Sequence, residues 1–134
     1  MDGVMKNGFK ISAVLPATPA QLYKAWLSTK GHTLMTGSAA RVSGKVGGKF
    51  TAWDGYIFGR TLELKPDQRI VQAWRTSEFP GDAPDSQLEV TLEKVRSGTR
   101  VILVHTGLPP GTASSYKQGW KDFYFTPMKE YFGK

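Results

Sequence analysis

The C-terminal end of the chain constrains the fold most, because seven of the sixteen aromatic residues lie between residues 116 and 132. Their spacing has the period of a helix, and one broad face carries Tyr116, Trp120, Phe123, Tyr124, Pro127, Met128 and Tyr131. A helix with so large an aromatic face needs a large apolar surface to pack against. Pro127 removes a helical hydrogen bond and costs roughly 3 kcal/mol inside a straight helix, so a kink or a break is predicted at about Thr126.

The middle of the chain has the pattern of a β-sheet that could provide this surface. Six segments rich in β-branched and aromatic residues are separated by short turns containing Gly, Pro or Asp: 39–43, 47–53, 55–64, 69–76, 87–95 and 99–106. A further strand is predicted over residues 8–16. Strands joined by such short turns pair antiparallel, because parallel strands need long crossover connections.

A helix is predicted between the first strand and the other six. Thr18 is a good N-cap, Pro19 occupies the first helical position, and Gln21 completes a capping box. Gly31 is predicted to end this helix, and residues 32–38 are predicted to form an irregular turn or one short helical turn.

This order of elements predicts a single α+β domain over residues 1–134. The expected architecture is an antiparallel sheet of about six or seven strands wrapped around a long C-terminal helix. A chain of 134 residues is long enough to bury one hydrophobic core without disulfides.

The charge distribution favours an acidic partner. The net charge is +7, and the stretch from Gly3 to Trp53 contains seven basic residues and no acidic one. Nucleic acid, an anionic membrane and an acidic protein are the candidates, although the bases are spaced singly, as on an ordinary solvated surface. No apolar run could span a membrane, no signal peptide is visible, and the absence of cysteine suits the cytoplasm, where the protein is expected.

The residues that catalysis or metal binding would require are mostly missing. The two histidines, His32 and His105, are far apart and lack ligand spacing, so neither a metal nor a cofactor is expected. The sequence shows no set of residues arranged for acid–base catalysis, so the chain is not expected to be an enzyme. Phe50 and Trp53 lie near Lys45, but the RNA-recognition signature is absent, so no nucleic-acid partner is expected. No membrane partner is expected either. His105 itself could be a buried hydrogen-bonded residue, a polar anchor in a ligand pocket or a proton-transfer group.

Several short motifs, in their order and spacing, resemble the activator of heat shock protein 90 ATPase family, and in particular the C-terminal domain of the eukaryotic activator. They are Gly47–Gly48 with Phe50, Asp54–Gly55, Gly59, Pro66, Ile70, Trp74, residues 105–109, Gly119–Trp120 and Tyr124–Phe125. The resemblance implies the helix-grip fold of the START and birch-pollen-allergen superfamily, in which the sheet grips the C-terminal helix. It also implies that Gly59 permits a close approach of helix to sheet.

The resemblance implies a co-chaperone-like module that binds a heat shock protein 90-type chaperone and modulates its ATPase. The alternative is a carrier or sensor of a small hydrophobic ligand held between the sheet and the helix. The candidate cavity residues are Phe50, Trp53, Trp74, His105, Trp120, Phe123 and Tyr124, and the same rings could instead fill that space completely. We expect a monomer.

Overall fold

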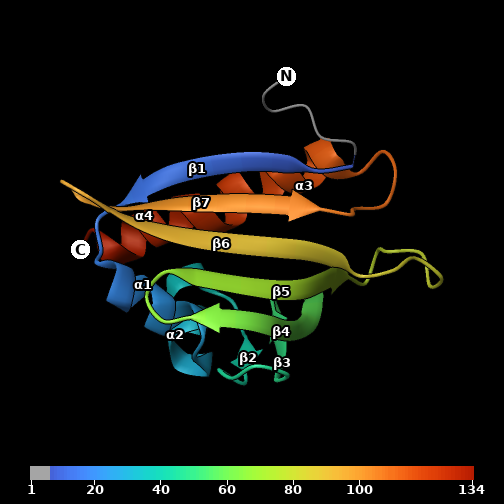
Figure 1. Cartoon of the computed structure of the whole chain (residues 1–134), viewed down its shortest axis with the longest axis horizontal. Coiled ribbons are helices and arrows are strands. Elements are labelled where there is room, and N and C mark those ends of the chain that lie inside the picture. Colours follow the sequence, from blue (N-terminus) through green and yellow to red (C-terminus); the bar gives the residue numbers. More distant parts are fainter. Residues whose placement is uncertain (1–6) are drawn as a thin grey trace.

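The computed structural model describes residues 7–134 and contains one seven-stranded antiparallel sheet, in the order β1-β7-β6-β5-β4-β3-β2 (Figure 1). The strands are β1 (Phe9–Leu15), β2 (Arg41–Val42), β3 (Lys49–Ala52), β4 (Ile57–Lys65), β5 (Arg69–Thr76), β6 (Ser86–Val95) and β7 (Gly98–Thr106). The α+β class and the predicted number of strands are confirmed. Within residues 7–134, no helix is both long and apolar enough to cross a membrane.

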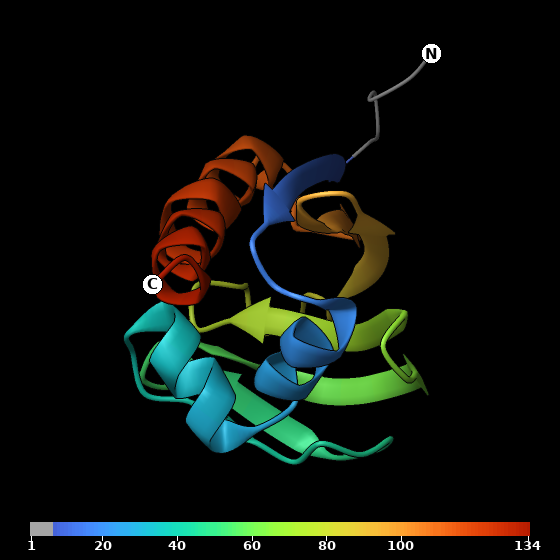
Figure 2. The same ribbon diagram turned by 90° about the vertical axis from the view of Figure 1, so that its left-hand side faces the viewer.

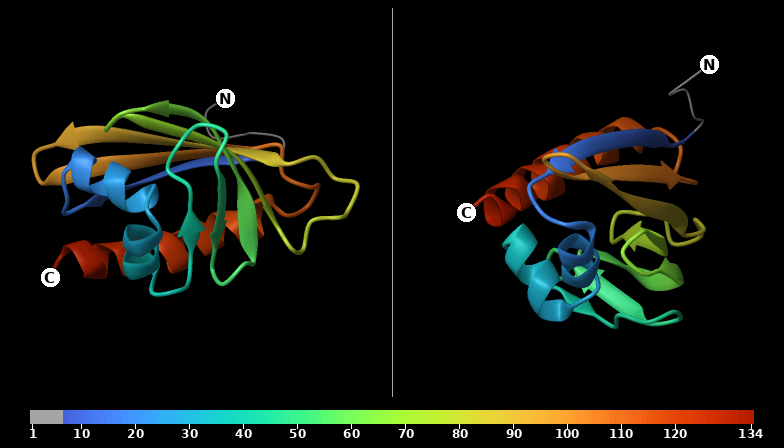
Figure 3. Two further views of the ribbon diagram at one scale, coloured as in Figure 1. Left: turned by 90° about the horizontal axis from the view of Figure 1, so that it is seen from below. Right: turned by 60° about the vertical axis from the view of Figure 1, so that its left-hand side comes forward.

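The C-terminal helix runs along one face of the sheet, and the two short helices near the N-terminus lie on the same side (Figures 2 and 3). The C-terminal helix consists of α3 (Ala113–Trp120), a π-helical segment η1 (Lys121–Phe125) and α4 (Thr126–Phe132). The helical path therefore continues through Thr126, and the irregularity takes the form of the π-helical segment that precedes Pro127. Such segments replace ordinary helical hydrogen bonds by bonds to the fifth residue back, here from the Thr126 N–H to the Lys121 carbonyl.

The buried face of this helix differs from the predicted one. Trp120, Tyr124 and Met128 are buried, as expected. These residues lie four apart, and the π-helical segment keeps them near one face because a π-helical turn holds more residues than an α-helical turn. Phe123, predicted on the buried face, is 54% exposed, whereas Phe125 is buried. A regular helical period extrapolated through residues 121–125 misplaces these two rings.

The predicted first helix is in fact two helices, α1 (Pro19–Trp26) and α2 (Thr29–Thr36). The capping box at Thr18 is confirmed. The predicted stop at Gly31 is wrong: the side chain of Ser28 accepts a hydrogen bond from the Gly31 N–H and starts α2, which ends at the left-handed Gly37. Gly31 is needed because a β-carbon there would lie 2.6 Å from the Cα of Ala25.

Gly59 permits a close approach within the sheet and not, as expected, between helix and sheet. A β-carbon at this position would overlap the carbonyl oxygen of Ala73 in the neighbouring strand and would lie 3.1 Å from the ring of Phe50. The glycine in β4 is therefore a packing requirement of the sheet itself.

Candidate functional site

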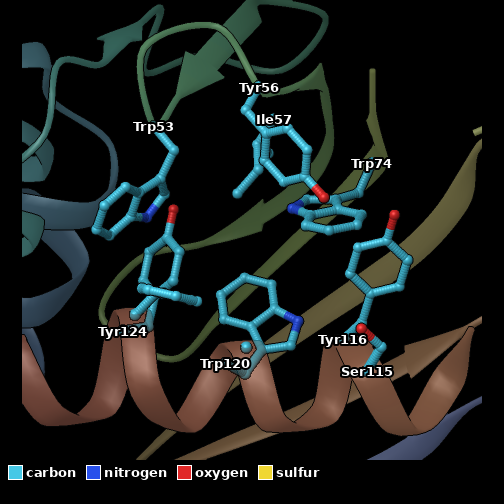
Figure 4. A pocket seen from close by; sticks show the side chains of 10 residues that line it. Trp53, Tyr56, Ile57, Trp74, Ser115, Tyr116, Trp120 and Tyr124 are labelled. Atoms are coloured by element: carbon cyan, nitrogen blue, oxygen red, sulfur yellow. The ribbon is translucent and has the colours of Figure 1, made fainter. Parts of the chain in front are cut away.

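An apolar pocket of about 360 Å³ lies between the sheet and the C-terminal helix and is open to solvent (Figure 4). Its residues come from the β3–β4 turn, β4, β5 and the C-terminal helix. They are Trp53, Tyr56, Ile57, Trp74, Ser115, Tyr116, Gly119, Trp120, Phe123 and Tyr124. The aromatic rings thus pack around this space without filling it.

Five of the seven candidate residues line the pocket: Trp53, Trp74, Trp120, Phe123 and Tyr124. Phe50 does not line it, and its buried ring lies beside Gly59 of β4. His105 does not line it either and is completely buried, with the rings of Trp74 and Trp120 packed against it.

Sequence reasoning did not place the other five lining residues in the pocket. Tyr116 lies four residues before Trp120, so its position on the predicted aromatic face could have indicated it. Gly119 contributes by having no side chain: a β-carbon there would have only the ring of Phe123 nearby, at 3.9 Å. No pattern in the sequence marks Tyr56, Ile57 or Ser115 as lining residues.

Trp53 is held at the pocket in an unusual backbone conformation. Trp53 and Asp54 have φ angles of 52° and 58°, and the Gly55 N–H donates to the Ala52 carbonyl at 3.2 Å, which defines a type I′ turn. This turn favours Asn, Asp or Gly, so a tryptophan in it costs about 1 kcal/mol or more. The ring of Trp53 packs edge-on against Phe123, with 5.3 Å between centroids.

The indole N–H of Trp53 has no hydrogen-bond partner although it is buried. Within residues 7–134 it is the only buried side-chain nitrogen or oxygen atom without one. A buried donor without a partner costs about 1–3 kcal/mol. The pocket is therefore apolar and aromatic, and one of its lining residues, Trp53, carries a buried polar group without a partner among the described residues.

His105 lies behind the pocket in a fully determined hydrogen-bond chain. The indole N–H of Trp120 donates to Nδ1 of His105 at 3.0 Å, so this nitrogen carries no proton. The proton is on Nε2, which donates to Oγ of Ser86 at 2.9 Å, and Ser86 donates in turn to the carbonyl of Trp74. Burial lowers the pKa of His105 to about 3, which keeps the ring neutral.

The serine–histidine pair in this chain lacks the arrangement of a nucleophile and its base. A base must present a free nitrogen lone pair to the hydroxyl, whereas Nε2 of His105 presents a proton to Ser86. Ser86 is 2% exposed, so its oxygen is also closed to a substrate. The chain of hydrogen bonds instead fixes Trp120 and Trp74, two walls of the pocket.

His32 fixes the next turn of the helix in the complementary tautomer. Its Nδ1 donates to the carbonyl of Trp26 at 2.9 Å, and its Nε2 accepts from the hydroxyl of Tyr124 at 2.8 Å. Burial lowers the pKa of His32 and outweighs the opposing effect of the hydrogen bond to Trp26. Each histidine thus accepts one hydrogen bond from a side chain of the C-terminal helix. Burial raises the pKa of the Tyr124 hydroxyl.

The two tyrosines of the pocket that lie outside this buried network are anchored by their hydroxyl groups. Tyr116 and Thr76 share a hydrogen bond of 2.7 Å, and Tyr56 donates to the carboxylate of Glu78. Burial, followed by the hydrogen bond to Glu78, raises the pKa of Tyr56. No group of three or more His, Cys, Asp or Glu residues that could hold a metal ion occurs in the described part of the chain.

Solved structures with the same fold cover nearly the whole of this chain. An HSP90 activator from Plasmodium falciparum has a TM-score of 0.84 and 26% sequence identity, over 95% of this chain and 96% of that one. A protein from Chromobacterium violaceum has a TM-score of 0.72 and 25% identity, over 92% and 95% of the two chains.

Comparison with known sequences gives the family. The chain is 27% identical over 116 residues to the human protein called Activator of 90 kDa heat shock protein ATPase homolog 1, which covers 87% of this chain and 34% of the human protein. It therefore spans about a third of the length of this relative. Residues 16–133 match the family described as Activator of Hsp90 ATPase homolog 1-like protein. The resemblance seen in the sequence motifs is confirmed, and the chain belongs to this family.

Proposed function

We propose that this domain binds an Hsp90-type chaperone and modulates its ATPase. The observation that carries the proposal is the match, over nearly the whole of both chains, to the HSP90 activator from Plasmodium falciparum. The match extends from the first strand to the terminal helix, so the likeness is not restricted to one motif.

Two further observations support a binding role without catalysis of its own. Both histidines are buried and use their ring nitrogens to hold the C-terminal helix, which leaves neither free for proton transfer with a substrate. The net charge of +7 favours association with an acidic surface and acts mainly on the rate of association.

The test is a calorimetric titration of the domain into the full-length chaperone from the same organism, together with the chaperone's ATPase rate. Saturable heat and a changed rate are expected. No heat and an unchanged rate would overturn the proposal.

A second candidate function, the binding of a small apolar ligand, is favoured by the pocket and its apolar aromatic lining. An apolar cavity with one or few polar groups is the usual form of a small-molecule site. The ligand chemistry that fits the aromatic lining is a flat, largely apolar molecule.

Gly119→Leu tests this candidate, because it fills the pocket from the helix while replacing glycine by a better helix former. Binding of anilinonaphthalene sulfonate, followed by its fluorescence, is expected for the wild type and lost in this variant. Gly119→Ala is the matched control, since one methyl group leaves the pocket open and gives a similar gain in helix propensity. Equal dye binding by all three proteins would place the dye elsewhere and refute the pocket as its site.

A further inference from the structure

Three cations without a carboxylate partner among the described residues share the outer face of the sheet with an exposed aromatic ring. Arg41 in β2, Lys49 in β3 and Arg60 in β4 lie on the same face as Phe58, since Lys49 is directly opposite Arg60 and Phe58 is opposite Thr51, the partner of Arg41. We call these four residues the basic face. All helices of residues 7–134 lie on the other side of the sheet, so no helix covers it (Figure 3).

The basic face is maintained against its own electrostatic repulsion. Lys49 and Arg60 form a directly opposed cross-strand pair of like charges, an arrangement that destabilises a sheet. Within the described residues none of its three cations lies within 4.0 Å of a carboxylate, whereas Arg69 and Arg75 in the neighbouring strand β5 are paired with Glu63, Glu89 and Asp85. Lys10, Lys65 and Lys94 in other parts of the sheet also have no carboxylate of the described residues within 4.0 Å, so the basic face is distinguished by its clustering. Three cations on one face, two of them directly opposed, form a surface suited to an anion from outside the chain.

We infer that the basic face docks an acidic segment of the partner protein, with an apolar side chain of that segment resting on Phe58. The inference rests on the proposed function and names the surface and the chemistry through which the chaperone would be bound. Phe58 is 37% exposed, so an incoming apolar group can cover it.

The neighbouring groups restrict how this partner can bind. The edge of the sheet is closed at Val42, whose N–H donates to the hydroxyl of Thr29 in α2 at 2.9 Å, so the segment cannot add there as a further strand. It must bind through side chains on the face. A long nucleic-acid strand fits less well, because a phosphate backbone continuing across the sheet meets the carboxylates of Glu63 and Glu89.

Lys49→Glu separates this role from a structural one. The new carboxylate lies opposite Arg60 and converts the repulsive pair into an attractive one, so the melting temperature is expected to rise by about 1–3 °C. The same change should weaken binding to the full-length chaperone by about fivefold to tenfold at low salt. A lower melting temperature would refute the electrostatic reasoning about this pair.

Lys10→Glu is the matched control, because Lys10 is exposed on the opposite edge strand β1 and faces the uncharged Val104. It changes the net charge equally and should alter chaperone affinity by less than about twofold. Equal losses in both variants would mean that only net charge matters, and no loss in Lys49→Glu would mean that the basic face is not used. Either result overturns the inference and leaves chaperone binding itself intact.

If the wild type does not bind the chaperone, the proposed function fails and a second measurement decides the inference. Fluorescence anisotropy with a labelled glutamate-rich peptide carrying one leucine should then show binding to the wild type and to Lys10→Glu, and weaker binding to Lys49→Glu. No peptide binding by the wild type overturns the inference. Tighter binding of a labelled oligo-dT of equal charge, lost in Lys49→Glu, overturns it in favour of nucleic acid.

Discussion

Acidification should destabilise this fold at pH values where most carboxylates are still ionised, because His105 must remain neutral to hold Trp120. A histidine that is neutral in the folded state and has a lowered pKa binds its proton more readily in the unfolded chain. Stability is therefore full above the unfolded pKa of about 6.5 and is lost as the pH falls from there toward the folded pKa of about 3. His32 acts in the same direction.

The size of the effect follows from the two pKa values of His105. Each pH unit between them changes the free energy of unfolding by about 1.4 kcal/mol. Lowering the pH from 7 to 5 crosses about one and a half of these units, because the unfolded histidine begins to titrate near 6.5. His105 alone should thus remove about 2 kcal/mol from the stability of the domain at pH 5.

The measurement is urea unfolding at pH 7 and pH 5, followed by tryptophan fluorescence, for the wild type and for His105→Gln. The glutamine amide has an oxygen that can accept from Trp120 and an N–H that can donate to Ser86, but it has no proton to gain in this range. The variant should lose about 2 kcal/mol less than the wild type on acidification. If both proteins lose the same free energy, folding does not lower the pKa of His105 and the reasoning is refuted.

Two further substitutions test the packing by the same unfolding assay. Trp120→Ala should lower the free energy of unfolding by about 3–5 kcal/mol, because the ring is 3% exposed. Phe123→Ala should lower it by less than about 1 kcal/mol, because that ring is 54% exposed. Similar costs for the two variants would mean that the helix is rotated. Gly59→Ala should destabilise the domain by about 1–3 kcal/mol, since its β-carbon would overlap the Ala73 carbonyl. Gly81→Ala should be near neutral, because no atom lies within 4 Å of the added carbon. An equally mild effect of Gly59→Ala would show that the sheet can relax there.

The strands were predictable because their signals are local. Apolar residues alternate with polar ones along a strand, and turn residues mark each of its boundaries. These two signals indicate each strand without reference to the rest of the chain. The predictions failed where tertiary contacts determine the local structure. Gly31 looks like a helix stop in isolation, but in the structure it allows α2 to pass close to Ala25, while Ser28 provides the cap that starts α2.

The aromatic character of the candidate site was predictable from the sequence, but only some of the individual residues that line it were. Trp74 and Trp120 lie in regular elements, so their direction follows from the period of a strand or helix. The position of Phe123 depends on the π-helical segment, which no period reveals, and that of Trp53 on a left-handed conformation that tryptophan rarely adopts. Whether rings fill a space or enclose it depends on volumes and contacts that patterning does not contain.

The pocket and the basic face share strand β4 and lie on opposite sides of it, so the two proposed activities are geometrically compatible. In β4, Ile57 lines the pocket while Phe58 and Arg60 point to the outer face. Filling the pocket with Gly119→Leu should therefore leave chaperone affinity unchanged, and Lys49→Glu should leave dye binding unchanged. If either variant alters both activities, the two sites are coupled, and β4 is the element through which a ligand in the pocket would influence chaperone binding.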